Sequence, residues 1–380
     1  MRLDGDGGAA IWTRSIVFAL LATACCTPAR SPKENVGVVV DSGLPDAGTP
    51  DAGSPDAGHD AGRPDAGFVE VRRTGRFFTH PDRPIRSALA NQPITEVERG
   101  HGGRSLGFRL TLADGTRGYF KPAQSFTGMT WQAELAAFHL DRELGLGRVA
   151  PSIGRRIAWQ VLEEAAGVDG RIDELEVVDD HLLGAFIWWV PERLRAVELP
   201  DGWERWLRID EDFPFVTPFQ RVNVYREQIA ALDENTPPRE VPAPPEPDRE
   251  DCPAELSDLI VFDYLIHNGD RWSTNRSNLR TLETGGPLMY LDNAAGFTMR
   301  RARTAMMDAR LGQVQRFRRS TIEAVRRLSM RRFTRRLDRD PLAPLLDEAQ
   351  LEHFEERRLH LLEYVDGLVE RFGEERVYSF

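Results

Sequence analysis

The stretch ELSDLIVFDYLIHNGDR, residues 255–271, decides the fold. Its first twelve residues are apolar on nearly every side of a helix, which predicts a buried helix from Glu255 to Ile266. The triplet HNG that follows is typical of a helix end and a turn. Asp270 and Arg271 are therefore expected on a loop directly after a buried helix.

A second carboxylate follows twenty-two residues later. The apolar run from Pro287 to Leu291 predicts a buried strand, and it ends at Asp292 in the motif LDNAAGF. One acid on a loop after a helix and another after a strand suit phosphoryl transfer, in which one carboxylate orients an acceptor hydroxyl and the other holds metal. Each acid alone is more typical of a turn or a helix cap.

Upstream of the helix, the alternating residues 106–112 and 116–121 predict a β-hairpin around the turn Ala113-Asp114-Gly115. The hairpin follows ERGHGGRSLG, residues 98–107, in which Gly102 and Gly103 would let backbone amides approach phosphate oxygens. A glycine loop between strands is more often only a turn. Residues 155–190 contain further strand-like pieces and end in LLGAFIWWV, a buried-strand pattern.

Lys121 is unusual in this chain, which has 47 arginines and only two lysines. A compact ammonium fits between phosphate oxygens where a planar guanidinium does not. The helix predicted over 130–144 places Glu134 beside its apolar stripe, and a buried carboxylate needs a cation. Lys121 is the candidate partner, and the alternative is a solvated glutamate on the helix surface.

The order of these parts is that of the protein kinases: a glycine loop, a lysine, a helical glutamate, an aspartate loop and a strand-end aspartate. Two asparagines compete as a further metal ligand. Asn275 lies at the protein-kinase spacing from Asp270, whereas Asn278 precedes an apolar residue, as such ligands often do. The second position is slightly favoured.

The chain resembles the secretory-pathway kinases that include the Golgi casein kinase, the glycosaminoglycan xylose kinase and four-jointed, called the family with sequence similarity twenty. The resemblance covers about residues 95–375 and is carried by AELAAFHLDRELGLGRVAPSIGR (133–155), FDYLIHNGDR (262–271) and LDNAAGF. It implies an α+β fold, an atypical two-lobed protein-kinase-like domain over 68–380. Its small β-rich N-lobe would span about 68–190 and its helical C-lobe about 191–380.

The resemblance also implies ATP and Mg²⁺ or Mn²⁺ as cofactors and a role for each motif residue. Lys121 would contact the nucleotide phosphates, Glu134 would pair with it and touch metal, Asp270 would be catalytic, and Asp292 would bind metal. The chain departs from the family at Trp272, where its members typically have histidine. It also cannot form the disulfides of the animal relatives, because its only cysteines are Cys25, Cys26 and Cys252.

The N-terminal part predicts export. Arg14 precedes an apolar run that is too short to span a bilayer, which is typical of a signal peptide over residues 1–24. Cys25 directly after a small-residue cleavage site favours a lipid anchor, the only expected link to a membrane; the alternative is secretion without lipid. Residues 45–67 repeat PDAG units, and residues 25–67 are expected to form a disordered linker. We therefore expect a periplasmic or cell-surface lipoprotein, or otherwise a secreted protein.

The charge distribution bears on partners. With 60 acidic and 49 basic residues, a net charge of -11 argues against nucleic-acid binding. Residues 300–339 nevertheless hold fourteen arginines and three carboxylates. One interpretation is that Arg316, Arg318 and Arg319 dock an acidic peptide or an acidic glycan. The alternative is that these arginines are solvated helix faces.

The sequence thus predicts a secreted or lipid-anchored kinase that transfers the γ-phosphoryl group of ATP to a protein Ser/Thr or a glycan hydroxyl. The alternative, from another class, is a catalytically inactive kinase-like module that binds a partner at a surface. The presence of Lys121, Glu134, Asp270 and Asp292 together argues against it, because a pure binding module does not need all four.

Overall fold

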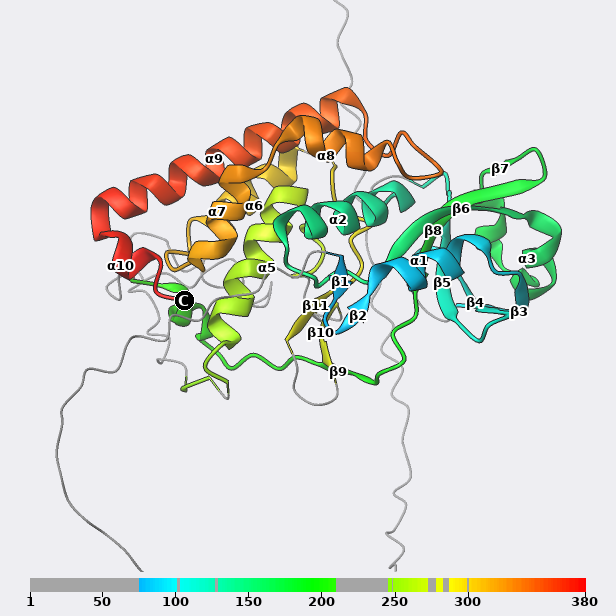
Figure 1. The fold of residues 1–380 in the computed structure, drawn as a ribbon, viewed down its shortest axis with the longest axis horizontal. Helices are drawn as coiled ribbons and strands as arrows, with labels where there is room; N and C mark the ends of the chain where they lie inside the picture. Colours follow the sequence, from blue (N-terminus) through cyan, green and yellow to red (C-terminus); the bar gives the residue numbers. More distant parts are fainter. Residues whose placement is uncertain are drawn as a thin grey trace, which may run out of the picture. The chain divides into compact units, whose positions relative to one another are not determined.

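The structure is a computed structural model that describes residues 75–100, 103–126, 129–209, 245–247, 249–272, 278–282, 287–298 and 301–380, without the side chains of 301–303 and 305. The predicted signal peptide, Cys25 and the repeat linker lie outside these residues. A strand-rich part comes first and a helical part follows, which confirms the predicted α+β fold (Figure 1). Among the helices described, none combines the length and the apolar character needed to cross a bilayer.

An antiparallel sheet forms the strand-rich part. Its strands lie in the order β3, β4, β5, β8 and β6, and β7 pairs with β8. Their bounds are β3 (Ile94–Arg99), β4 (Phe108–Leu112), β5 (Arg117–Pro122), β6 (Ser152–Ala158), β7 (Val177–Val178) and β8 (His181–Trp188). Gly115 adopts a φ of 82° in the turn between β4 and β5, a conformation that glycine takes without strain. This turn confirms the predicted hairpin.

One face of this sheet is buried. On β4, Phe108, Leu110 and Leu112 are buried and alternate with less buried residues, as a strand with one face in a core requires. They belong to one core with apolar residues of two helices, α1 (Asp82–Asn91) and α3 (Trp159–Ala166). Helix α3 lies inside the stretch 155–190 that was predicted to hold strands, so that prediction was incomplete.

The other face of the sheet carries Lys121. Phe120 is fully buried in the core described above, and the pleat therefore directs the neighbouring Tyr119 and Lys121 to the opposite side. The helix α2 (Trp131–Leu144) contacts the sheet at β6 and β8 and confirms the predicted helix. The Thr130 side chain caps its N-terminus by accepting a hydrogen bond from the amide of Ala133.

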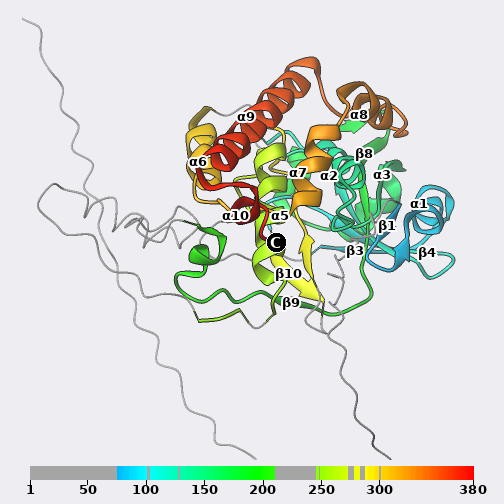
Figure 2. The same cartoon turned by 60° about the vertical axis from the view of Figure 1, so that its left-hand side comes forward.

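The helical part is built around α5 (Cys252–Ile266), which is buried over almost its whole length and confirms the predicted buried helix. The long helix α9 packs across α5 and α7 (Figure 2). An Asp347–Gln350 capping box begins this helix. The other helices of this part are α6 (Arg301–Leu311), α7 (Arg319–Arg327), α8 (Met330–Leu337), α9 (Glu348–Phe372) and α10 (Glu374–Val377).

A second, three-stranded sheet lies in the order β11, β10, β9. Its strand β9 (Leu194–Ala196) follows β8 after a five-residue connection, and β10 (Leu279–Leu282) and β11 (Leu288–Tyr290) follow α5 in the chain. Strand β11 confirms the predicted strand before Asp292. Two single-turn helices, η1 (Gly170–Glu174) and η2 (Trp203–Leu207), complete the described elements, together with the short pair β1 (Arg76–Phe77) and β2 (His80–Pro81).

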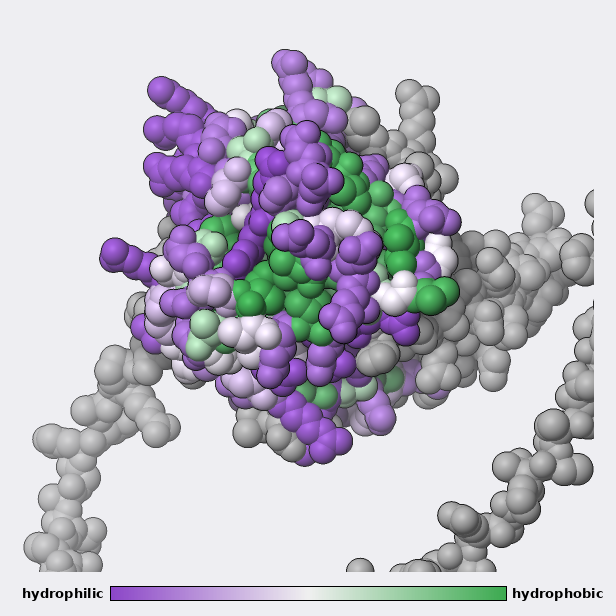
Figure 3. All heavy atoms as spheres, turned by 90° about the vertical axis from the view of Figure 1, so that its right-hand side faces the viewer, coloured by the Kyte–Doolittle hydropathy of each residue, from purple (hydrophilic) through white to green (hydrophobic). Residues whose placement is uncertain are grey.

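The surface differs between the two parts. Figure 3 views the strand-rich side and shows groups of apolar side chains among hydrophilic ones. Four valines of the strand-rich part are exposed: Val161 on α3, Val168 just after α3, and Val177 and Val178 on β7. On α7 and α8, by contrast, the exposed positions are mostly arginines. The predicted basic region therefore lies on the helical part.

Candidate active site

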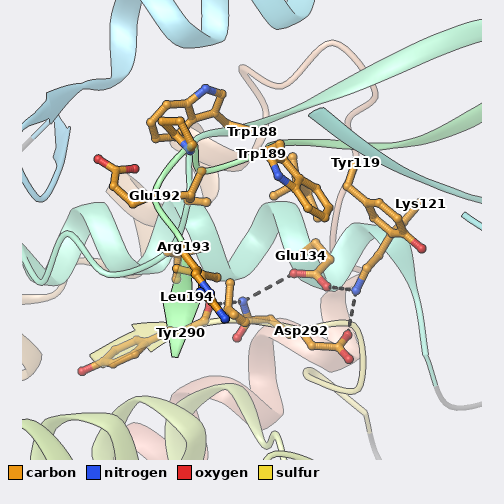
Figure 4. A pocket seen from close by; sticks show the side chains of 17 residues that line it. Tyr119, Lys121, Glu134, Trp188, Trp189, Glu192, Arg193, Leu194, Tyr290 and Asp292 are labelled. Carbon is orange, nitrogen blue, oxygen red and sulfur yellow. Dashed lines mark hydrogen bonds and ion pairs between the residues drawn. The ribbon is translucent and has the colours of Figure 1, made fainter. Parts of the chain in front are cut away.

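A pocket of about 530 Å³ opens beside the sheet face that carries Lys121 (Figure 4). One part of its lining is mostly apolar or aromatic and comes from residues 149–150, β8, the connection after it and β11, with Glu192 and Arg193 as the charged residues of that connection. The other part holds the charged residues Lys121, Glu134 and Asp292. A pocket with an apolar part and a few convergent polar groups is the usual form of a small-molecule site.

Lys121 joins two carboxylates that come from distant parts of the chain. Its Nζ donates to Oε1 of Glu134 on α2 and to Oδ1 of Asp292 after β11, over 2.6 Å in each case (Figure 4). The exposed fraction is 16% for the side chain of Lys121 and 4% for that of Glu134, against 38% for that of Asp292. The predicted pairing of lysine and helical glutamate is thus present, and the glutamate is buried rather than solvated.

The two carboxylates dominate the ionisation of this group. Burial alone would lower the pKa of Lys121, but the charges of Asp292 and Glu134 outweigh it and raise the pKa above the usual lysine range. The ammonium in turn holds the pKa of Asp292 below its usual value, against the opposite effect of burial. Lys121 and Asp292 are therefore charged at neutral pH.

Asp292 lies on a constrained loop. Its backbone has a φ of 55°, which is uncommon for a residue other than glycine and marks a position held by its surroundings. The side-chain Nδ2 of Asn278 donates to Oδ2 of Asp292 over 3.2 Å. The next residue, Asn293, donates to Glu134 over 3.4 Å and to the carbonyl of Tyr290 over 3.0 Å. The predicted metal residues Asp292 and Asn278 thus lie together, whereas Asn275 lies outside the described residues.

Asp270 stands on the loop after α5, as predicted, and is partly exposed. The helix ends at His267, whose φ of 59° is left-handed. Asn268 then links two loops: its Oδ1 accepts from the amide of Asp270, and its Nδ2 donates to the carbonyl of Asp292, each over 3.2 Å. This side chain brings the loops of the two aspartates together, a role that the turn-like triplet HNG did not indicate.

A buried arginine fastens the same two loops. Arg271 is fully buried and its Nε donates to both oxygens of Asp263 on α5, over 3.0 and 2.9 Å. Its Nη2 donates to Oδ1 of Asn293 over 2.7 Å, and its Nη1 donates to the carbonyl of Leu291. Burial raises the pKa of Asp263, and the charge of Arg271 opposes that effect. The guanidinium thus ties α5 to the segment that carries Asp292.

Trp272, which departs from the family pattern, is structural in this chain. It is 2% exposed, and its Nε1 donates to Oδ2 of Asp263 over 3.0 Å. Its ring stacks on Trp203 of η2 with centroids 5.7 Å apart. The Trp272 side chain therefore anchors the loop of Asp270 to α5 and η2.

The glycine-rich segment, residues 98–107, is described except for residues 101–102, so that Gly102 falls outside. The amide of Gly100 donates to the carbonyl of Gly107 over 2.7 Å and closes the base of the segment. A Cβ at either glycine would lie 2.5 Å from the Tyr119 hydroxyl, so a larger residue at either position would displace the Tyr119 side chain. Gly103 adopts a φ of 79°. Tyr119 itself lines the pocket, a role that its i, i+2 spacing from Lys121 on one strand could have indicated.

The three arginines considered for docking have partners inside the chain. Arg316 donates to Oγ of Ser379 over 2.7 Å, and Arg318 donates to Asp258 over 3.0 Å. Arg319 donates to Glu374 over 2.9 Å. These contacts favour a structural role for the three side chains over the docking of an acidic acceptor.

The donor set near Asp292 suits a hard divalent cation. The described residues hold no group of three His, Cys, Asp or Glu side chains that could bind a metal by itself. Mg²⁺, however, typically takes one or two carboxylates and completes its shell with substrate phosphates and water. Asp292, with Asn278 beside it and Glu134 across Lys121, offers oxygen ligands of this kind at the edge of the pocket.

Comparison with known proteins identifies one matching family model and two similar human kinases. Residues 217–377 match the family model described as Golgi casein kinase, C-terminal, Fam20. The glycosaminoglycan xylosylkinase of Homo sapiens is 26% identical over 336 residues, which cover 77% of this chain and 76% of that protein. The extracellular serine/threonine protein kinase FAM20C of Homo sapiens is 26% identical over 330 residues, 75% of this chain and 54% of its own length.

The solved structures include the Golgi casein kinase with Mn and ADP bound. It superposes with a TM-score of 0.56 at 18% identity and covers 77% of each chain, a likeness that concerns the fold. The family model covers the motifs around Asp270 and Asp292, and the two human relatives agree with the resemblance found in the sequence. In sequence and in fold the chain is thus similar to the Fam20 kinases.

Proposed function

We propose that this chain is an ATP-dependent kinase that transfers the γ-phosphoryl group to a hydroxyl of a protein Ser/Thr or of a glycan. The observation that carries the proposal is the convergence of Lys121, Glu134 and Asp292 in one pocket, with 2.6 Å between the ammonium and each carboxylate. The loop of Asp270 adjoins this group through Asn268. This is the set of charged groups that phosphoryl transfer uses for positioning and charge stabilisation.

The donor site would use the charged part of the pocket. Asp292 and Asn278 would hold Mg²⁺ or Mn²⁺, and Lys121 would contact the nucleotide phosphates while Glu134 keeps its ammonium in place. When bound, the cation would neutralise the negative charge on the phosphate oxygens. The apolar part, which includes Val149, Ile187 and Leu194, would receive the base of the nucleotide.

Asp270 would act on the acceptor. A carboxylate that accepts the proton of the attacking hydroxyl orients this group toward the γ-phosphorus and becomes important in the transition state. Asp270 is partly exposed and its loop is fixed by Asn268 and Arg271, so the carboxylate is accessible on a rigid support. We therefore assign the catalytic role to Asp270.

The class of acceptor and the location are proposals of their own. One human relative is a xylosylkinase of glycosaminoglycans and the other a serine/threonine protein kinase, so both hydroxyl types are candidates. We propose an acidic protein or glycan as acceptor, without assigning its docking to Arg316, Arg318 or Arg319. We further propose that residues 1–24 direct export and that Cys25 is lipidated, which would leave a periplasmic or cell-surface enzyme tethered by residues 25–67.

The experiment incubates the full chain with ATP labelled at the γ-phosphate, Mg²⁺ or Mn²⁺, and two acceptor sets: casein-like acidic proteins and xylose-containing glycosaminoglycan primers. We expect metal-dependent label on one set and none with Asp292→Ala. Nucleotide binding without transfer to any hydroxyl acceptor, envelope fractions included, would instead support the inactive binding module.

A further inference from the structure

Two residues of η1, Arg171 and Glu174, form hydrogen bonds with the glycine-rich segment. Arg171 donates from Nη1 to the carbonyl oxygens of Gly103, over 3.3 Å, and of Ser105, over 3.2 Å. Arg104 of the segment forms two parallel hydrogen bonds with the carboxylate of Glu174, over 2.6 and 2.7 Å. A pair of this fork-to-fork kind fixes direction as well as distance. The segment is therefore held at three successive residues, Gly103, Arg104 and Ser105.

Arg171 is oriented before it meets the segment. Its Nε and Nη2 donate to the two carboxylate oxygens of Asp169, over 2.9 and 2.7 Å, which leaves Nη1 directed at the segment. Hydrogen bonds from the side chain and the amide of Arg171 hold the pKa of Asp169 well below its usual range. The carboxylate therefore stays charged at neutral pH and keeps the guanidinium in one orientation.

The same region is attached to the strand that carries Lys121. The amide of Ser125 donates to the carbonyl of Glu174 over 2.8 Å. Gln124, three residues after Lys121, accepts from the amide of Leu106 over 2.8 Å and donates to its carbonyl over 3.1 Å. The glycine-rich segment, η1 and the residues directly after β5 thus form one hydrogen-bonded unit that continues the strand of Lys121.

We propose that Arg171 and Glu174 are positioning residues that hold the glycine-rich segment next to the nucleotide phosphates. The inference rests on the proposed kinase function and adds to it two residues that touch neither nucleotide nor acceptor. They act through the segment, whose base lies against the pocket residue Tyr119. A segment held in place in advance loses less conformational entropy when the nucleotide binds, so the contacts act on the binding of ATP.

The first test removes the donor of Arg171 in the full chain. Arg171→Met should raise the KM for ATP about tenfold, as the loss of hydrogen bonds from a charged donor implies, with kcat within about twofold. Hydrogen exchange of the amides at 103–107, measured without nucleotide, should become about tenfold faster in the variant. Arg156→Met is the matched control, because Arg156 on β6 forms an exposed ion pair with Asp179 in the turn between β7 and β8. It should change neither quantity.

The second test uses the pair of Arg104 and Glu174. Glu174→Gln should raise the KM for ATP by about three- to fivefold, since an exposed ion pair contributes little. The exchanged pair Arg104→Glu/Glu174→Arg should return the KM toward that of the wild type. If Arg104 instead bound phosphate directly, Glu174→Gln would free it and lower the KM, and the exchanged pair would not recover. That result would overturn the proposed role of Glu174.

Unchanged exchange at 103–107 together with an unchanged KM in Arg171→Met would overturn the proposal as a whole. A lowered thermal midpoint identifies a variant that unfolds. In that case the KM of the exchanged pair Arg104→Glu/Glu174→Arg tests the proposal, because this variant keeps both charges. The hydrogen exchange is independent of catalysis. A wild type that binds no ATP with Mg²⁺ or Mn²⁺ would therefore refute the proposed function, while the exchange data alone would still report on the contacts of Arg171.

Discussion

Lys121 donates a hydrogen bond of 2.6 Å to Oδ1 of Asp292, although 171 positions separate the two residues in the chain. The contact joins β5 to the loop after β11, and Glu134 on α2 accepts a second bond from the same ammonium. Three elements thus depend on one lysine in a chain whose usual cation is arginine. The site exists only when the strand-rich part and the helical part are both folded.

Lys121→Arg tests whether this position requires an ammonium. The guanidinium is wider and planar, and it would not place one nitrogen 2.6 Å from both carboxylates in a largely buried position. We expect kcat/KM for transfer to fall about 100-fold or more, since displacement of a positioning group by 1 Å has this effect. Arg117→Lys, at an exposed position of the same strand, is the control and should be neutral. Wild-type turnover in Lys121→Arg would contradict the assignment.

Asp292→Asn tests the metal site. The variant keeps the size of the side chain but loses its charge, and a hard cation binds a carboxylate much better than an amide. We expect the metal-dependent part of ATP binding to fall at least about tenfold, as measured by titration with and without Mg²⁺. Binding of ATP that is equally strong without metal in the wild type would show that Asp292 holds no cation on the phosphates.

The buried side chain of His139 is expected to make the stability of the protein depend on pH. Burial lowers the pKa of His139 below its ordinary value of 6.5, although the carboxylate of Asp340 lies 3.9 Å from Nε2. Arg86 and Arg336 also disfavour its protonation. Within the described residues neither ring nitrogen has a hydrogen-bond partner. The neutral form is therefore the one that the folded state accommodates.

The direction of this pH dependence follows from the lowered pKa of His139. Below pH 6.5 the unfolded chain takes up the proton before the folded one does, so the free energy of unfolding decreases as the pH falls, by at most about 1.4 kcal/mol per unit. We expect urea unfolding of His139→Leu to show a smaller decrease between pH 7 and pH 5 than that of the wild type. Parallel curves for the two proteins would disprove this role.

Replacement of Arg271 is expected to cause a large loss of stability. Arg271→Met leaves the carboxylate of Asp263 buried without its cation, which typically costs about 3–5 kcal/mol in the free energy of unfolding. The double variant Asp263→Leu/Arg271→Met removes both charges and should cost less than the sum of the two single variants. Additive costs in denaturant unfolding would mean that the two side chains do not act as a pair.

Much of the fold could be predicted because its main elements carry strong local patterns. The hairpin around Gly115, the helix after Thr130 and the buried helix before His267 follow from alternation, capping and continuous apolar character. Helix α3 was missed because it is only eight residues long and lies between strands. The three-stranded sheet was missed because two of its strands, β9 and β10, are separated by more than eighty residues.

The charged residues of the candidate site could be predicted from the sequence, but the residues that hold them in place could not. Lys121, Glu134 and Asp292 stand out by residue type and by their order in the chain. Asn268 and Arg271 belong to a sequence that reads as an ordinary turn, and their partners Asp292 and Asn293 lie over twenty residues away. Local charge patterns likewise could not reveal that Arg316 and Arg319 contact the C-terminal residues Ser379 and Glu374.

The central claim is that Asp270 acts on the acceptor while Lys121 and Asp292 hold the donor. The measurement that tests it most directly compares the wild type with Asp270→Asn for transfer of labelled phosphate from ATP and for binding of ATP with Mg²⁺ or Mn²⁺. We predict that transfer falls about 100-fold or more, as loss of a catalytic base implies, while ATP affinity stays within about threefold. Transfer at the wild-type rate, or a loss of ATP binding as large as the loss of transfer, would contradict the account.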